Sequence, residues 1–104
     1  MILYNVTTKI LPEVHEEWLQ WMNTVHVPDV MKTGYFTGFR LCKLDKHDDD
    51  DEELTYVFQY TTNTREDLNR YLNEHAPALR EDVVKKFKDK FFAFRTVMEV
   101  MSEG

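Results

Sequence analysis

Two helical segments of this sequence contain the same short pattern, a histidine followed two positions later by a proline. The first segment carries both tryptophans of the chain and runs into His26 and Pro28; the second carries the pattern at His75 and Pro77. Each segment follows a strand-like run and precedes another. The sequence is therefore predicted to contain a duplicated β-α-β unit, which restricts the folds open to it.

Four segments show the alternation of apolar and polar residues that is typical of half-buried β-strands. They are rich in β-branched and aromatic residues and cover residues 2–10, 35–44, 54–62 and 91–101. The face of these strands toward the helices is expected to carry Ile2, Tyr4, Val6, Ile10, Leu54, Tyr56, Phe58, Tyr60, Phe92, Phe94, Met98 and Val100. Alternation then places Arg95 on the opposite face.

Two helices are expected between the strands, and a proline interrupts each of them. The first begins at Pro12, where a missing backbone N–H costs nothing, and the second follows Thr64, a residue suited to capping a helix N-terminus. Pro28 disfavours helical geometry at the residue before it, so the first helix is predicted to end or bend near His26. Pro77 is predicted to kink the second helix in the same way.

The order of these elements, β-α-β-β-α-β, defines a fold class. Right-handed crossovers place both kinked helices on one face of a four-stranded antiparallel sheet. The sequence therefore predicts an α+β, ferredoxin-like fold in a single domain of residues 1–104, a length at which one core is feasible. Residues 45–53 hold seven acidic residues in nine, and they are expected to form a solvated hairpin loop and not a cation site.

The face of the sheet away from the helices is expected to be partly apolar. The residues assigned to it are Leu3, Asn5, Thr7, Phe36, Arg40, Cys42, Val57, Gln59, Arg95 and Val97. This mixture is too apolar to face only solvent and too polar for a dry core. Because so short a chain has no second sheet, a second copy is expected to cover this face and to form a homodimeric α/β barrel with a partly polar lumen.

Composition and charge argue against several classes of function. The net charge of −6 disfavours nucleic-acid binding, which needs a basic surface. No apolar run reaches the roughly 18 residues of a membrane span and no signal-peptide pattern is present, so we expect a cytoplasmic protein without a membrane partner. The single cysteine, Cys42, excludes an internal disulfide and a zinc site built from several cysteines. No metal and no cofactor are therefore expected.

Several short motifs occur within the predicted elements: Tyr4-Asn5-Val6-Thr7, His15-Glu16-Glu17-Trp18, His26-x-Pro28, Gly34-x-Phe36, Tyr71-Leu72-x-x-His75-Ala76-Pro77-x-Leu79-Arg80 and Phe94-Arg95-Thr96. On these motifs the sequence resembles the dimeric α/β-barrel superfamily, the ferredoxin-like group that includes antibiotic-biosynthesis and haem-degrading monooxygenases. More closely, it resembles a family of small bacterial proteins known only as a domain of unknown function. The resemblance covers nearly the whole chain except the acidic segment. It implies the fold and supplies no activity.

The haem-degrading relatives offer a catalytic set for comparison. It consists of an asparagine on the first strand, a tryptophan on the third strand and a histidine on the second helix. Asn5 and His75 match two of these positions by element, whereas the third strand carries Gln59 and Tyr60 but no tryptophan. Catalytic residues therefore stay unassigned, and the sequence leaves open whether the protein is an enzyme.

Six residues are candidates for binding a ligand: Asn5, His26, Arg40, Gln59, His75 and Arg95. His26 and His75 either bracket a pocket between helices and sheet, where one of them carries a proton, or each bonds a carbonyl group freed by its kink. Arg40 and Arg95 either pair with a carboxylate, such as Glu99 or its equivalent in a partner, or bind an anionic ligand through bidentate hydrogen bonds.

Three functions from different classes are compatible with these residues. The first is a homodimeric barrel that binds a small anionic or amphipathic molecule. The second is a monooxygenase-type enzyme of the antibiotic-biosynthesis or haem-degrading kind. The third is a structural dimer that acts through protein contacts. A ligand retained through purification would distinguish the first function from the third, and oxygen consumption with a defined substrate would establish the second.

Overall fold

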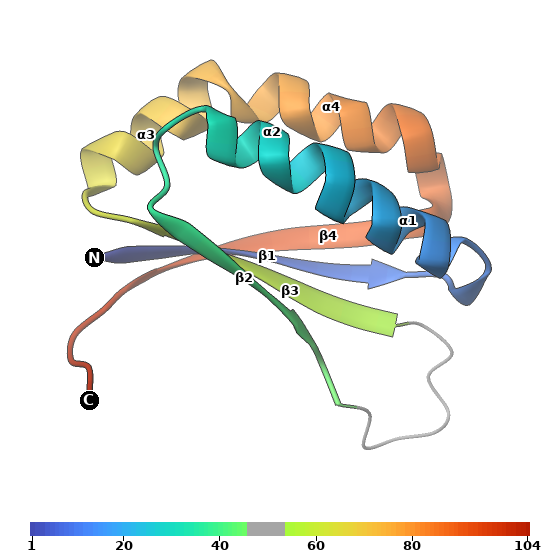
Figure 1. Ribbon diagram of the computed structural model, residues 1–104, viewed down its shortest axis with the longest axis horizontal. Coiled ribbons are helices and arrows are strands. Elements are labelled where there is room, and N and C mark those ends of the chain that lie inside the picture. The colour runs from blue at the N-terminus through green and yellow to red at the C-terminus, as the bar shows by residue number, and fades with distance from the viewer. Residues whose placement is uncertain (46–53) are drawn as a thin grey trace.

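The computed structural model describes residues 1–45 and 54–104, whose backbone forms one sheet and two helical segments (Figure 1). The strands are β1 (Ile2–Ile10), β2 (Gly38–Lys43), β3 (Leu54–Thr62) and β4 (Phe91–Glu99), which pair antiparallel in the order β2-β3-β1-β4. The first helical segment consists of a 3-10 turn (Pro12–Val14), α1 (His15–Trp21), a π turn (Met22–His26) and α2 (Val27–Lys32). The second consists of α3 (Arg65–Glu74), α4 (Ala76–Phe87) and a 3-10 turn (Lys88–Lys90).

The predicted ferredoxin-like arrangement is confirmed. Both helical segments lie on one side of the sheet, and the other side is uncovered in the single chain (Figure 1). We call this uncovered side the open face. The acidic hairpin loop expected at residues 45–53 lies outside the described residues, except for Asp45.

The core fills the space between the helices and the sheet. Alternate residues of β1 and β3 point into it as predicted, and Tyr4, Phe58 and Tyr60 are at most 3% exposed. Trp18 of α1 is fully buried, and its ring centroid lies 5.3 Å from that of Tyr56 and 5.8 Å from that of Phe58. Each such side chain contributes about 1.5–3 kcal/mol when it leaves water, so this alternation fixes which face of the sheet the helices cover.

The first helical segment passes through Pro28 without ending. Val27 keeps helical dihedral angles (φ −60°, ψ −46°), so the prediction that Pro28 forces it out of the helix is wrong. A proline clashes with the carbonyl group four residues earlier in a regular α-helix. Here the wider π turn ends immediately before α2, and Pro28 occupies the first turn of α2, where its missing N–H is tolerated. The π turn holds His26 at its C-terminal end.

The second helical segment is kinked, as predicted. His75 separates α3 from α4 with φ −122° and ψ −40°, and Pro77 follows in the first turn of α4. The N–H of His75 still donates to the carbonyl of Tyr71 at 2.9 Å, and the N–H of Leu79 donates to the carbonyl of His75 at 3.2 Å. The break therefore changes the helix direction while most backbone groups keep their partners.

Strand β4 presents its side chains in the register opposite to the predicted one. Val6 of β1 pairs with Arg95, and Thr8 pairs with Ala93, so Arg95 lies on the helix side of the sheet and not on the open face. Phe92, Phe94 and Met98 lie on the open face instead, where they are 63%, 45% and 44% exposed. A shift of one residue turns every side chain of a strand to the other face. Consecutive residues point to opposite faces, so Phe91, Phe92 and Phe94 place apolar side chains on both faces of the strand. The alternation therefore did not fix the register.

Phe36 is also placed differently from the prediction. It precedes β2, which begins only at Gly38, and its side chain is 6% exposed on the helix side. Its ring centroid lies 4.7 Å from that of Tyr71 and 5.1 Å from that of Tyr60. The connection from α2 thus contributes an aromatic ring to the core before the chain enters the sheet.

Candidate functional site

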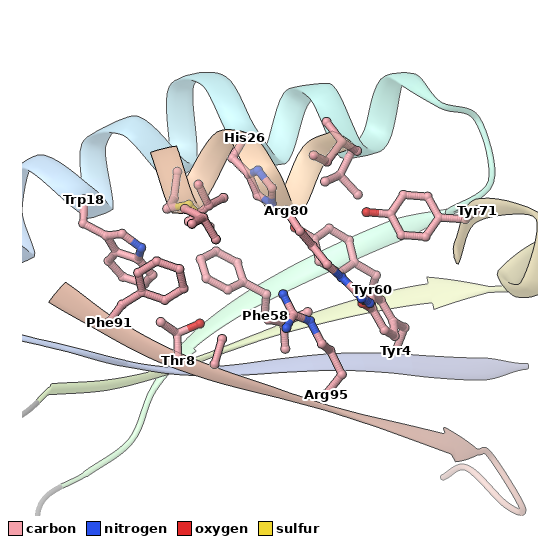
Figure 2. Close-up of a pocket in the computed structure, with 17 residues that line it drawn as sticks. Tyr4, Thr8, Trp18, His26, Phe58, Tyr60, Tyr71, Arg80, Phe91 and Arg95 are labelled. Carbon is pink, nitrogen blue, oxygen red and sulfur yellow. The ribbon is translucent and has the colours of Figure 1, made fainter. Parts of the chain in front are cut away.

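A cavity of about 240 Å³ lies between the two helical segments and the sheet (Figure 2). Most of its lining is apolar or aromatic: Val6, Trp18, Met22, Val30, Phe58, Leu79, Val83, Val84, Phe91 and Ala93. The polar lining residues are Tyr4, Thr8, His26, Tyr60, Tyr71, Arg80 and Arg95. No carboxylate side chain occurs among these lining residues. An apolar cavity with a few convergent polar groups is the usual form of a small-molecule site.

Two arginines enter this cavity from opposite layers of the fold. Arg80 comes from α4, whereas Arg95 rises from β4 toward the helices (Figure 2). Within residues 1–45 and 54–104, neither guanidinium group forms an ion pair with a carboxylate. Both positive charges act on the Tyr71 hydroxyl, where they lower a pKa that burial raises. The cavity therefore concentrates positive charge in a protein whose net charge is −6.

Arg80 is held in place by one hydrogen bond. Its Nη2 donates to the hydroxyl of Tyr4 at 2.9 Å, while its Nε is buried and has no partner among the described residues. Tyr4 is itself enclosed by aromatic rings, with its centroid 6.0 Å from Tyr71 and 6.3 Å from Tyr60. Burial raises the pKa of both Tyr60 and Tyr71 above the ordinary value, so these hydroxyl groups stay protonated at neutral pH.

His26 reaches the cavity from the π turn. Burial lowers its pKa to about 4, and the charge of Arg95 acts in the same direction, whereas Asp29 and Asp82 oppose the shift. The imidazole is therefore neutral at pH 7, with one nitrogen able to accept a proton or a hydrogen bond. Its ring stacks on that of Trp21 at a centroid distance of 5.9 Å, which restrains its orientation.

Trp18 contributes a second buried donor at another part of the cavity. Its Nε1 has no hydrogen-bond partner among the described residues, although the side chain is fully buried. Its ring packs against Tyr56 and Phe58, and in the view of Figure 2 it lies toward the end of the cavity away from Tyr4. Buried donors are usually satisfied, so an unpaired one that lines a cavity marks a place for an acceptor.

The candidate residues inferred from the sequence fall in three places. His26 and Arg95 line the cavity, and Arg40 and Gln59 line a separate hollow of about 450 Å³ on the open face. Asn5 is also on the open face, 4% exposed, with its Oδ1 unpaired among the described residues.

His75 lines neither space. Its ring lies 5.6 Å from Tyr35 and 6.4 Å from Tyr71, beside the break between α3 and α4. His26 and His75 therefore do not bracket one pocket.

The sequence-based candidates did not include Arg80 or Trp18. A signal for Arg80 was present, because Ala76, Val83 and Phe87 are buried at helical spacing and Arg80 falls on the same stripe. A charged residue in such a stripe needs a partner or a ligand. Trp18 offered no comparable signal, since a tryptophan in an apolar stripe is typical of a core.

Two further properties of the described part of the chain bear on function. Residues 1–45 and 54–104 contain no group of three or more histidine, cysteine, aspartate or glutamate side chains arranged to hold a metal ion. Within those same ranges, no helix has both the length and the apolar character needed to span a bilayer.

The fold and the cavity define a ferredoxin-like α+β protein with a potential binding site between its helices and its sheet. Over residues 1–101 the sequence matches the family described as a domain of unknown function (DUF4286), and the chain belongs to that family. Among curated proteins, none matches the sequence.

Solved structures share the fold at low sequence identity. An EthD family protein from Bacillus halodurans is 16% identical, with a TM-score of 0.69 over 97% of this chain and 100% of that one. A dimeric ferredoxin-like protein from an uncultured marine organism is 19% identical, with a TM-score of 0.66 over 100% of this chain and 98% of the other. SnoaB, a cofactor-independent oxygenase from Streptomyces nogalater, is 10% identical, with a TM-score of 0.62 over 98% and 95%. These similarities establish the fold alone.

Proposed function

We propose that this protein is a homodimer that binds a small amphipathic anion in the cavity between its helices and its sheet. The single observation that carries this proposal is the pair of arginines, Arg80 and Arg95, in a largely apolar cavity whose lining contains no carboxylate. A ligand with an apolar body and one anionic group satisfies both properties of the site.

The two guanidinium groups differ in burial: Arg80 is half-buried, with its Nε buried and unpaired among the described residues, whereas Arg95 is exposed in the single chain. For Arg80, the part of the charge that is shielded from water is unfavourable unless an opposite charge and hydrogen bonds compensate it. Guanidinium groups match carboxylates and phosphates geometrically because their N–H donors lie in one plane. Arg80 keeps its Nε free while Nη2 is bound to Tyr4, so it retains donors for such an anion.

Dimerisation is supported by the open face. Phe92, Phe94 and Met98 expose large apolar surface there, and the buried Oδ1 of Asn5 has no hydrogen-bond partner within residues 1–45 and 54–104. Contiguous exposed apolar surface marks interaction sites in soluble proteins. A second copy of the chain is the proposed occupant, because two ferredoxin-like neighbours from an uncultured marine organism are described as dimeric.

The anion proposal is tested with ligand pairs of the same shape and different charge. Calorimetric titration with benzoate and with benzamide compares an anion with its neutral analogue. We expect saturable binding of benzoate, one per chain, and binding of benzamide at least about tenfold weaker because it cannot compensate the guanidinium charges. Equal binding of the two compounds, or no binding of either, would overturn the proposal.

A monooxygenase-type activity is the second candidate function, and one observation favours it. His26 is neutral at pH 7 and lines the same cavity as the two arginines, so its unprotonated nitrogen can accept a hydrogen bond from a bound ligand, while the pKa of about 4 makes it a weak base. A cofactor-independent oxygenase shares the fold. The third strand offers Tyr60 to the cavity and no tryptophan, which departs from the set of the haem-degrading relatives.

Oxygen uptake in the presence of a ligand found by calorimetry tests this second function. Uptake that depends on His26 would establish the enzyme. Stable binding of the ligand without oxygen uptake would support the binding function and contradict the monooxygenase-type activity. A dimer that binds no small molecule at all would instead favour the structural function through protein contacts.

A further inference from the structure

Among the residues that the structure describes, two buried hydrogen-bond donors of the cavity have no partner, and they belong to different helical segments. One is Arg80 Nε on α4, and the other is Trp18 Nε1 on α1. Both residues line the cavity. An amphipathic anion with a single polar end can accept a hydrogen bond only from the arginine. A hydrogen bond from Trp18 Nε1 requires a second acceptor on the ligand.

The sheet register shows how far apart these two donors are. Arg80 is hydrogen-bonded to Tyr4, whereas Trp18 packs against Tyr56 and Phe58, which pair with Thr8 and Val6 of β1. The two donors therefore lie over β1 positions about two to four residues apart, or about 7–13 Å at the rise of a strand. Hydrogen bonds of about 2.9 Å at each end leave at most about 7 Å between the two ligand acceptors.

One six-membered ring with substituents on opposite sides fits within this limit. The cavity lining includes Val6, Met22, Phe58 and Val83, which offer apolar and aromatic contacts for a flat ring. A volume of about 240 Å³ exceeds the roughly 150 Å³ of an apolar cavity that binds benzene, so it admits a single ring with short substituents.

We propose that the ligand is an aromatic carboxylate with an oxygen acceptor at the para position. Its carboxylate binds Arg80 and Arg95, its ring lies over Phe58, and its distal oxygen accepts a hydrogen bond from Trp18 Nε1. This inference rests on the proposed binding of an amphipathic anion and adds the polarity, length and second recognition point of that ligand.

Three para-substituted probes separate this inference from the proposed function. Benzoate has no distal group, 4-methylbenzoate has an apolar one, and 4-hydroxybenzoate has an acceptor of nearly the same size as the methyl group. We expect 4-hydroxybenzoate to bind about five- to tenfold more tightly than 4-methylbenzoate, the effect of one additional hydrogen bond. Trp18→Phe removes the donor and is expected to abolish this preference.

Because Trp18 is fully buried, the Trp18→Phe variant is complemented by a direct measurement on the unaltered protein, which does not depend on whether the variant folds. The chain has two indole N–H signals, and Trp21, which does not line the cavity, serves as the internal control. In nitrogen-15 labelled protein we expect 4-hydroxybenzoate to shift the Trp18 indole N–H signal downfield, and 4-methylbenzoate to leave it without that shift.

The outcomes are distinguishable. If benzoate and both analogues bind equally and the Trp18 N–H signal responds to all three alike, the anion site stands and the para-acceptor inference is overturned. If none of the three binds, the proposed function fails and this inference fails with it.

Discussion

Arg80 Nη2 donates a hydrogen bond to the hydroxyl of Tyr4 at 2.9 Å, which ties α4 to the central strand β1 across the core. Tyr4 is 3% exposed, and four aromatic or cationic side chains surround its ring and hydroxyl: Phe36, Tyr60, Tyr71 and Arg80. The bond orients a positively charged group toward the cavity without neutralising it. In our interpretation, this arrangement positions the guanidinium group for an anionic ligand.

The Tyr4→Phe substitution tests that positioning role. It removes the acceptor for Arg80 and is expected to lower the free energy of unfolding by about 0.5–1.5 kcal/mol. Benzoate affinity is expected to fall severalfold, because Arg80 then samples more rotamers before it meets the ligand. Calorimetry and chemical unfolding measure the two effects.

Tyr35→Phe is the matched control for this substitution. The Tyr35 hydroxyl donates to Glu74 at 3.0 Å, and Tyr35 does not line the cavity. The control should leave benzoate affinity unchanged. Equal losses of affinity in both variants would show that Tyr4 acts only through general stability.

The low pKa of His26 predicts a pH dependence of folding. Its pKa is about 4 in the folded protein against 6.5 in the unfolded chain, so between these values only the unfolded chain binds the proton. The free energy of unfolding should therefore decrease as the pH falls from 6.5 to 4, by about 3 kcal/mol in all. Asp29, Asp82 and Arg95 also act on the imidazole.

Unfolding by denaturant at a series of pH values measures this slope. His26→Gln removes the titrating group and is expected to flatten the profile between pH 4 and 6.5. His75→Gln serves as the control because His75 does not line the cavity. If the pH profile keeps its slope in His26→Gln and loses it in His75→Gln, the pH dependence comes from His75 and the prediction for His26 is wrong.

Much of the fold followed from the sequence, because the chemistry of β1 and β3 is unambiguous. Their alternation of large apolar and polar residues fixed the buried face. Strand β4 begins with four apolar residues, Phe91, Phe92, Ala93 and Phe94, so both of its faces are apolar at this end. Only the pairing with β1 settles its register. The correct register moves Arg95 from the open face into the cavity.

The candidate site was less predictable for a different reason. Tyr4 and Arg80 are joined only by tertiary folding, and no local pattern of residues links them. The accommodation of Pro28 by a π turn likewise depends on the packing of the whole helical segment. The resulting position of His26 on the cavity could be proposed from the sequence, but its separation from His75 could not.

The open face predicts the oligomeric state. Light scattering coupled to size exclusion should give about twice the chain mass of 12.5 kDa. Phe94→Glu places a charge among the exposed apolar residues of this face and should yield monomer or unfolded protein. Val25→Glu is the control, since Val25 is similarly exposed (39% against 45%) but lies on the helical layer. A parent protein that elutes as a stable monomer would contradict the barrel.

The central claim, that Arg80 and Arg95 together form the anion site, is tested most directly by calorimetric titration of benzoate into a variant with both arginines replaced by methionine. Methionine removes the guanidinium group and keeps an apolar side chain of similar length, so the apolar part of the cavity lining is preserved. Arg70→Met is the control, because Arg70 is paired with Glu66 on the exposed side of α3. We predict that the double variant folds and that its affinity for benzoate falls on the order of 100-fold or more, while the control binds like the parent. Undiminished benzoate binding by the folded double variant would contradict the account.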